Sequence, residues 1–135
     1  MPRRARLIAP AILGASALLT AIPVPSAERM PPYVAGRAVP DDEILFCLHE
    51  RAAILLRDSL ADLRSEAEVM AVVSAGKCDY GPVTHTPVQV VAEYRRARFD
   101  DASFQVIRSA YTASRGDATT HGILYLITER PLVAR

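Results

Sequence analysis

The stretch from Asp41 to Cys78 constrains the fold of this chain most strongly, because both of its cysteines lie near the two ends of the stretch. Apolar residues recur in it at a spacing of three or four, which is typical of a helix with one buried face. This apolar stripe consists of Leu45, Leu48, Ala52, Leu55, Leu56, Leu60, Leu63, Ala67, Met70 and Val73. We therefore expect a helical region whose ends are joined by a covalent bond.

The helical region is expected to begin at Asp41, since acidic residues are favoured in the first turn of a helix. Ser65 and Glu68 have the spacing of a capping box, in which each side chain bonds to the backbone of the other residue. This spacing predicts a bend followed by a second, shorter helix that ends at Ala75, before Gly76. A single bent helix is the alternative.

Cys47 and Cys78 are the only two cysteines, so a single intramolecular pairing exists. The bridge would close a loop of about 32 residues and, in the chain-entropy account, contribute about 3–4 kcal/mol. The C-x-x-C spacing of redox proteins is absent from the sequence. We interpret the pair as a structural disulfide, which persists in oxidising compartments.

The first 27 residues predict export from the cytoplasm. A positive segment from Met1 to Arg6 precedes an uncharged apolar run over 7–22, and small residues and prolines follow up to Ala27. This order is typical of a signal peptide, although no position in it is a clear cleavage site. The alternative is an uncleaved anchor in the inner membrane, for which the run is shorter than the about 20 residues of a membrane span. We predict a periplasmic or secreted protein.

The charge of the exported part argues against nucleic-acid binding. The whole chain has a formal net charge of +1, but three of its arginines lie in the export segment. A mature chain beginning near Glu28 keeps 13 basic residues against 15 acidic ones, a net charge of −2 without a basic block. The arginine- and alanine-rich composition, with one lysine and no asparagine, suggests a GC-rich bacterial genome.

The rest of the chain predicts a proline-rich extended linker over 28–40 and a β-rich tail after Cys78. Asp79-Tyr80-Gly81-Pro82 is typical of a turn. Three strands are then expected at Thr86–Tyr94, Phe104–Tyr111 and Gly122–Thr128, with a turn at 114–117 between the last two. We predict an α+β domain over 41–135, in which a bent helix or two-helix hairpin packs on a three-stranded antiparallel sheet. An SH3-like half-barrel is compatible with this strand count.

The sequence predicts no catalytic, cofactor-binding or metal-binding residue. His49, His85 and His121 could in principle bind zinc, but their spacing matches no zinc motif. The remaining candidates have simpler explanations as a helix start, solvated loops or a tight turn. They are the acidic pairs Asp41-Asp42 and Asp100-Asp101, the basic cluster 95–98 beside Phe99, and Arg115-Gly116-Asp117.

The function expected from these features is that of a small bacterial envelope protein that binds an unidentified protein or envelope component without catalysis. The connections over 95–101 and 112–121 are the expected contacts, because loops carried by a rigid sheet commonly bind partners. A structural or stress-resistance protein of the periplasm is the alternative, and a small secreted enzyme ranks third. The disulfide pair Cys47 and Cys78 is the one site that the sequence assigns.

Overall fold

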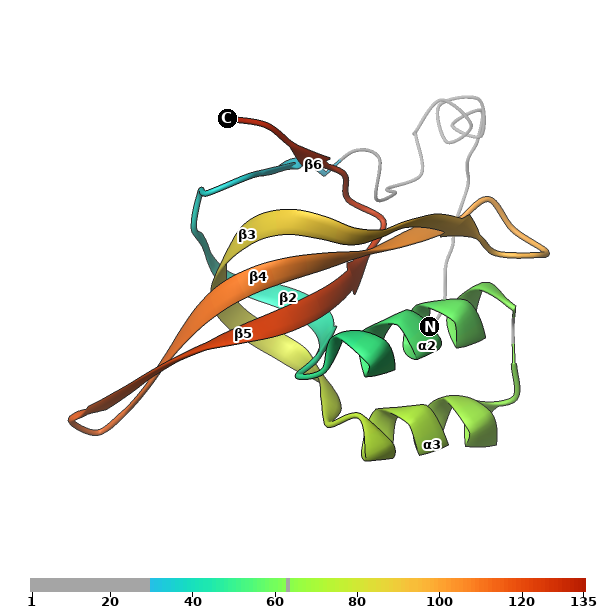
Figure 1. Ribbon diagram of the computed structural model, residues 1–135, viewed down its shortest axis with the longest axis horizontal. Helices are drawn as coiled ribbons and strands as arrows, with labels where there is room; N and C mark the ends of the chain where they lie inside the picture. The colour runs from blue at the N-terminus through green and yellow to red at the C-terminus, as the bar shows by residue number, and fades with distance from the viewer. Residues whose placement is uncertain (1–29, 63) are drawn as a thin grey trace, which may run out of the picture.

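Four long strands dominate the part of the chain that the computed structural model describes, residues 30–62 and 64–135 (Figure 1). They are β2 (Val39–Cys47), β3 (Cys78–Arg96), β4 (Ser103–Arg115) and β5 (Ala118–Thr128). Each strand pairs antiparallel with its neighbours, and β2 also pairs with β5, so that the sheet closes into a barrel. The α+β class is confirmed, but the prediction of a three-stranded sheet is wrong.

Of the four barrel strands, β2 is the one that the sequence did not predict. Leu45, Phe46 and Cys47 pair with β5 on one side and with β3 on the other, so the prediction of a helix beginning at Asp41 is wrong. Whether a segment forms a strand depends on how its side chains pack against the neighbouring strands. The spacing of apolar residues within the segment carries no information about those neighbours. Closure of the barrel depends on this strand.

The turn predicted at Asp79-Tyr80-Gly81-Pro82 is also wrong, because these residues continue β3 and pair with β2. Turn-forming residues within a strand are tolerated where the neighbouring strand does not need the missing proline N–H group. By contrast, β4 and β5 are joined at Gly116, which has a positive φ of 60°, within the predicted turn at 114–117.

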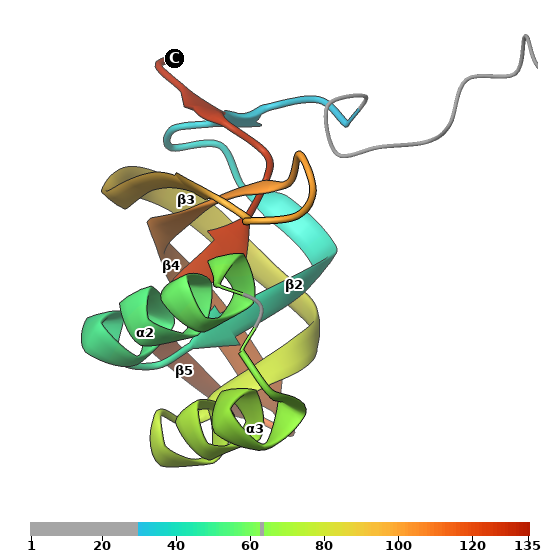
Figure 2. The same ribbon diagram turned by 90° about the vertical axis from the view of Figure 1, so that its right-hand side faces the viewer.

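Two helices follow β2: α2 (Glu50–Ala61) and α3 (Glu66–Ala75). The Ser65 hydroxyl accepts a 3.3 Å hydrogen bond from the Glu68 N–H, and the Glu68 carboxylate accepts one of 3.3 Å from the Ser65 N–H. The predicted capping box and the second, shorter helix ending at Ala75 are therefore confirmed. Figure 2 shows both helices on the same side of the barrel.

A disulfide joins Cys47 to Cys78 at the two ends of the helical hairpin, as predicted. The two residues are direct neighbours in the β2–β3 register, and both are buried. The bridge therefore holds the last residue of β2 to the first residue of β3, and the whole α2–α3 hairpin lies within the loop that it closes.

Within residues 30–62 and 64–135, the apolar core consists of two clusters on opposite faces of the sheet, because side chains alternate along a strand. One cluster lies between the helices and the barrel; its buried members are Cys47, Ala52, Ala53, Leu56, Cys78, Val106 and Ile127. The other lies on the opposite face; its buried members are Tyr33, Ile44, Ile107, Leu124 and Leu126. The predicted leucine stripe is only partly buried, since Leu55 and Met70 are about half exposed.

The chain before the barrel packs against it. Strand β1 (Tyr33–Val34) pairs in parallel with β6 (Leu132–Val133), and Tyr33 is buried. Part of the segment 28–40, which was expected to be a linker, is thus in contact with the domain.

The predicted signal peptide, residues 1–27, lies outside the described residues. None of the described helices is long and apolar enough to cross a membrane.

Candidate functional site

Asp42 is directed toward the buried side chains of Tyr33 and His85 by an irregularity in β2. The β2–β3 register shifts between Val39 and Asp42, and Asp41 within this interval has a positive φ of 45°. Aspartate is one of the few residues that tolerate this conformation. Bulges of this kind redirect the side chains that follow them. As a result, the side chain of Asp42 is only 11% exposed although it lies in a run of polar residues.

The carboxylate of Asp42 holds together a group of four side chains, which we call the Asp42 cluster: Tyr33, Asp42, His85 and Arg130. Its Oδ2 atom accepts hydrogen bonds from the Tyr33 hydroxyl at 2.6 Å and from His85 Nε2 at 2.9 Å. Arg130 Nη1 lies 3.6 Å from Oδ1, and its guanidinium carbon lies 3.9 Å from the centre of the Tyr33 ring. The cluster thus pairs a carboxylate with a cation and with two polar donors.

The environment of this cluster fixes its proton positions. A carboxylate only accepts hydrogen bonds, so the Nε2 atom of His85 carries a proton. Burial, together with the hydrogen bond to Asp42, raises the pKa of Tyr33 above its ordinary value and keeps the hydroxyl protonated. His85 Nδ1 is buried and has no hydrogen-bond partner within the described part of the chain. In a neutral imidazole this second nitrogen is an acceptor.

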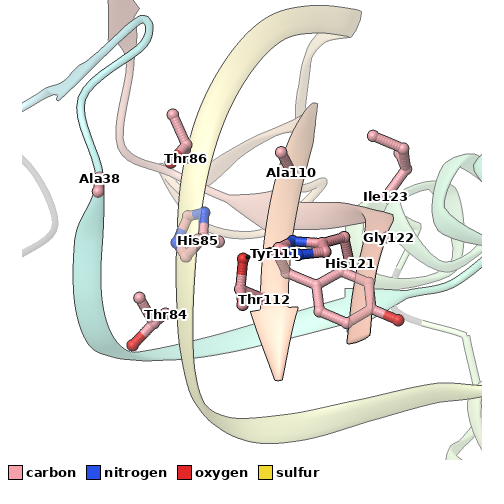
Figure 3. A pocket seen from close by; sticks show the side chains of 10 residues that line it. All are labelled: Ala38, Thr84, His85, Thr86, Ala110, Tyr111, Thr112, His121, Gly122 and Ile123. Carbon is pink, nitrogen blue, oxygen red and sulfur yellow. Dashed lines mark hydrogen bonds between the residues drawn. The ribbon is translucent and has the colours of Figure 1, made fainter. Parts of the chain in front are cut away.

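His85 also lines an open hollow of about 500 Å³, which we call the barrel-end hollow (Figure 3). Three strands supply its wall, β3 through 84–86, β4 through 110–112 and β5 through 121–123, and Ala38 completes it just before β2. The lining residues are Ala38, Thr84, His85, Thr86, Ala110, Tyr111, Thr112, His121, Gly122 and Ile123. The set contains three hydroxyl groups of threonine, two imidazoles and one phenol, and it contains no Asp, Glu, Lys or Arg.

One wall of the hollow depends on a glycine. Tyr111 and Gly122 are direct neighbours in the β4–β5 register. A Cβ atom at Gly122 would lie 2.6 Å from Cε1 of Tyr111, which is closer than van der Waals contact allows. The tyrosine ring therefore lies across the glycine, and the absence of a side chain at position 122 sets the position of that ring.

The structure brings two of the three histidines together. His85 and His121 line the same hollow, whereas His49 lies at the groove between the helices. Residues 30–62 and 64–135 contain no group of three or more His, Cys, Asp or Glu side chains that could hold a metal ion. Thr112 Oγ1 lies 3.3 Å from His121 Nδ1, a contact that their pairing across β4 and β5 explains.

The other residues considered from the sequence lie apart from the hollow. Asp41 is exposed while Asp42 is enclosed, so the two do not act as a pair of carboxylates. Arg95 pairs with Asp62 of the α2 end at 2.8 Å. Arg115-Gly116-Asp117 lies at the tip of the β4–β5 hairpin, as the predicted turn required.

Tyr33 and Arg130 were not identified from the sequence, and Asp42 was considered only as part of the acidic pair Asp41-Asp42. Tyr33 lies 9 positions before Asp42, and Arg130 lies 88 positions after it. The three residues meet only because β1 and the end of β5 lie beside the β2 bulge. The assignment of Asp42 to a helix start also concealed its burial. Comparison with protein-family models, with curated proteins and with solved structures finds no match to this chain.

Proposed function

We propose that this protein is an exported, non-catalytic binding module and that its ligand occupies the barrel-end hollow. The hollow itself is the observation that carries the proposal: about 500 Å³ of open space at the end of a closed barrel. This volume is within the about 300–1,000 Å³ typical of small-molecule sites, and such sites combine apolar walls with a few polar groups. The disulfide supports export, because such bonds persist outside the cytoplasm.

The lining groups favour an uncharged ligand that carries hydroxyl groups. Thr84, Thr86 and Thr112 offer hydroxyls, and His121 is exposed at the rim. Among the described residues that line the hollow, a charged ligand would find no side chain of Asp, Glu, Lys or Arg to pair with. Tyr111 adds an aromatic surface, which provides apolar contact area beside a polar group. A short neutral oligosaccharide has this combination of hydroxyl groups and apolar ring faces.

Binding is favoured over catalysis by the arrangement of the imidazoles. The Nε2 atom of His85 is bonded to Asp42, and the ring is fully enclosed, so it cannot approach a substrate without movement. His121 contacts a threonine hydroxyl, but a nucleophile–base pair also needs a third group that orients the base. A ligand would therefore be held by the hollow without a reaction.

The proposal is tested by titrating ¹⁵N-labelled protein with maltotriose and with triacetylchitotriose and following the amide resonances. We expect shifts at Thr84–Thr86, Thr112 and Gly122 with at least one saccharide, and weaker binding after His121→Ala. His49→Ala is the matched control, because His49 is an exposed histidine outside the hollow.

Shifts confined to other surfaces, or no shifts with either saccharide, would contradict the proposal and favour a structural role in the periplasm. Cleavage of the saccharide during the titration would show instead that the protein is an enzyme.

A further inference from the structure

The two helices leave an apolar groove on the outside of the molecule, away from the barrel-end hollow. We call it the helix groove. It has a volume of about 410 Å³, and six of its lining residues are apolar or glycine: Ala52, Leu55, Ala71, Val72, Ala75 and Gly76. It is independent of the function proposed above, since no residue lines both the groove and the hollow.

Helix α3 is apolar, but its apolar side chains are at most partly buried. Five consecutive residues, Val69–Val73, are apolar, yet α3 contains no buried residue. Leu55 on α2 is 46% exposed and faces the groove. Single exposed apolar side chains are common on proteins, but a contiguous apolar patch usually marks an interaction surface.

The groove is held in a fixed shape. The capping box fixes the first turn of α3, and at its other end Gly76 packs directly on α2. A Cβ atom at Gly76 would lie only 2.2 Å from the Cβ atom of Ala52, so the helices approach closely there. Because the groove exists before any partner arrives, little ordering is needed when it is covered.

A cation lines one end of the groove, and an acidic side chain lies on α3 beyond the lining residues at the other end. His49 and Arg51 line it where α2 begins. Glu68 lies toward the other end, on the same face of α3 as Val72 and Ala75, because residues four and seven apart share one face of a helix. Arg64 is also at this end, but its positive charge is paired, because its Nη2 atom lies 3.9 Å from the carboxylate of Asp62.

We propose that the helix groove is the interface of a homodimer in which the α2–α3 hairpins of two copies form an antiparallel four-helix bundle. A two-fold axis makes such an interface self-complementary, so Arg51 of each copy meets Glu68 of the other. The small residues Ala71, Ala75 and Gly76 allow the helices to approach, and Leu55 of each copy enters the groove of the second.

The first test is analytical ultracentrifugation of the purified protein, with its N-terminus determined by mass spectrometry, from about 1 μM to about 1 mM. We expect a monomer–dimer equilibrium that Leu55→Asp weakens at least about tenfold, because a carboxylate would be buried at the centre of the interface. Val88→Asp is the matched control: Val88 is 44% exposed, lies on β3 and does not line the groove. Circular dichroism establishes that both variants are folded.

A second set of variants tests the charge pairing. Arg51→Glu should weaken the dimer by about tenfold, because it places two carboxylates together. Glu68→Gln, which retains the capping box, should also weaken the wild-type dimer. In the Arg51→Glu background, however, Glu68→Gln should strengthen the dimer, since it removes a repulsion. This reversal of sign is expected only if the two positions meet across the interface.

Three results would overturn the proposal. They are a monomer at all of these concentrations, a dimer that Leu55→Asp leaves unchanged, and the same direction of effect for Glu68→Gln in both backgrounds. Binding of the monomer to phosphatidylglycerol vesicles through Leu55, in place of dimerisation, would show instead that the groove faces lipid.

Discussion

The Tyr33 hydroxyl donates a 2.6 Å hydrogen bond to the Asp42 carboxylate, and this bond joins the N-terminal strand β1 to the bulge in β2. The same carboxylate oxygen accepts from His85 Nε2. Because His85 also lines the barrel-end hollow, the position of the hollow's one enclosed imidazole depends on the Asp42 cluster. The stability of this cluster and the shape of the proposed site are therefore linked.

Tyr33→Phe should lower the free energy of unfolding by about 1–3 kcal/mol, because it removes one donor from an enclosed carboxylate while keeping the ring. The ring contact with Arg130 is retained in the variant, so the change reports on the hydroxyl. Urea unfolding followed by circular dichroism measures the effect. Tyr80→Phe is the control, since Tyr80 is 64% exposed. Equal midpoints for the two variants would contradict the assigned role of this hydrogen bond.

The raised pKa of Tyr33 predicts a loss of stability at alkaline pH. An unfolded chain loses its tyrosine protons near pH 10, whereas folded Tyr33 keeps its proton above that pH. The contribution of this group is therefore complete below about pH 10 and is lost as the pH rises toward the folded pKa. We expect the wild type to lose more stability between pH 9 and pH 11 than Tyr33→Phe does. Parallel pH profiles of the two proteins would contradict this prediction.

Gly76→Ala should destabilise the protein by about 1–3 kcal/mol, because the added methyl group would overlap Ala52 where α3 ends against α2. The φ of Gly76 is −94°, so the cost comes from the contact and not from the backbone conformation. Combining it with Ala52→Gly should recover part of the loss beyond what the two single changes predict. Thermal denaturation of the four proteins measures this coupling, and strict additivity would argue against the close approach.

The second helix and the disulfide could be predicted because their signals are local. Ser65, Glu68 and Gly76 specify the start and end of α3 through their own backbone contacts, and two cysteines allow only one pairing. The strand β2 could not be predicted in the same way. Leu45 fits a helical stripe as well as an alternating strand, and only pairing with β3 and β5 decides between them.

The candidate site was even less predictable, since its polar residues come from separate parts of the chain. Asp42 becomes an enclosed acceptor only because the bulge at Asp41 turns it. Pro40, a residue type that occurs at bulges, was assigned to the linker instead. His85 and His121 share a hollow through the β3–β4–β5 register, which their spacing along the chain does not reveal. Residues 112–121 form the outer part of the β4–β5 hairpin beside the hollow. The expectation that this segment contacts a partner stays a prediction.

Ser65→Ala should lower the stability of the protein by about 1 kcal/mol, because the Glu68 N–H loses its acceptor at the start of α3. Helix α3 contains no buried residue, so the effect should be concentrated there. Amide hydrogen exchange should show faster exchange in α3 and little change in β4. Ser74→Ala, an exposed serine within the same helix, is the matched control. Similar exchange rates in the two variants would contradict the role of the capping box.

Removal of the disulfide should cost about 3–4 kcal/mol, a large part of the about 5–15 kcal/mol that stabilises a typical domain. The bridge shortens the unfolded chain by closing the segment that contains both helices, and Cys47 and Cys78 are 31 positions apart. We expect a reductant to lower the melting temperature of the wild type by several degrees or more and to leave Cys47→Ala/Cys78→Ala unaffected. Because both residues are buried, the double variant should melt at or below the temperature of the reduced wild type, as the lost sulfur atoms also leave small cavities. Equal melting temperatures for the oxidised and reduced wild type would show that the helical hairpin is held by packing alone.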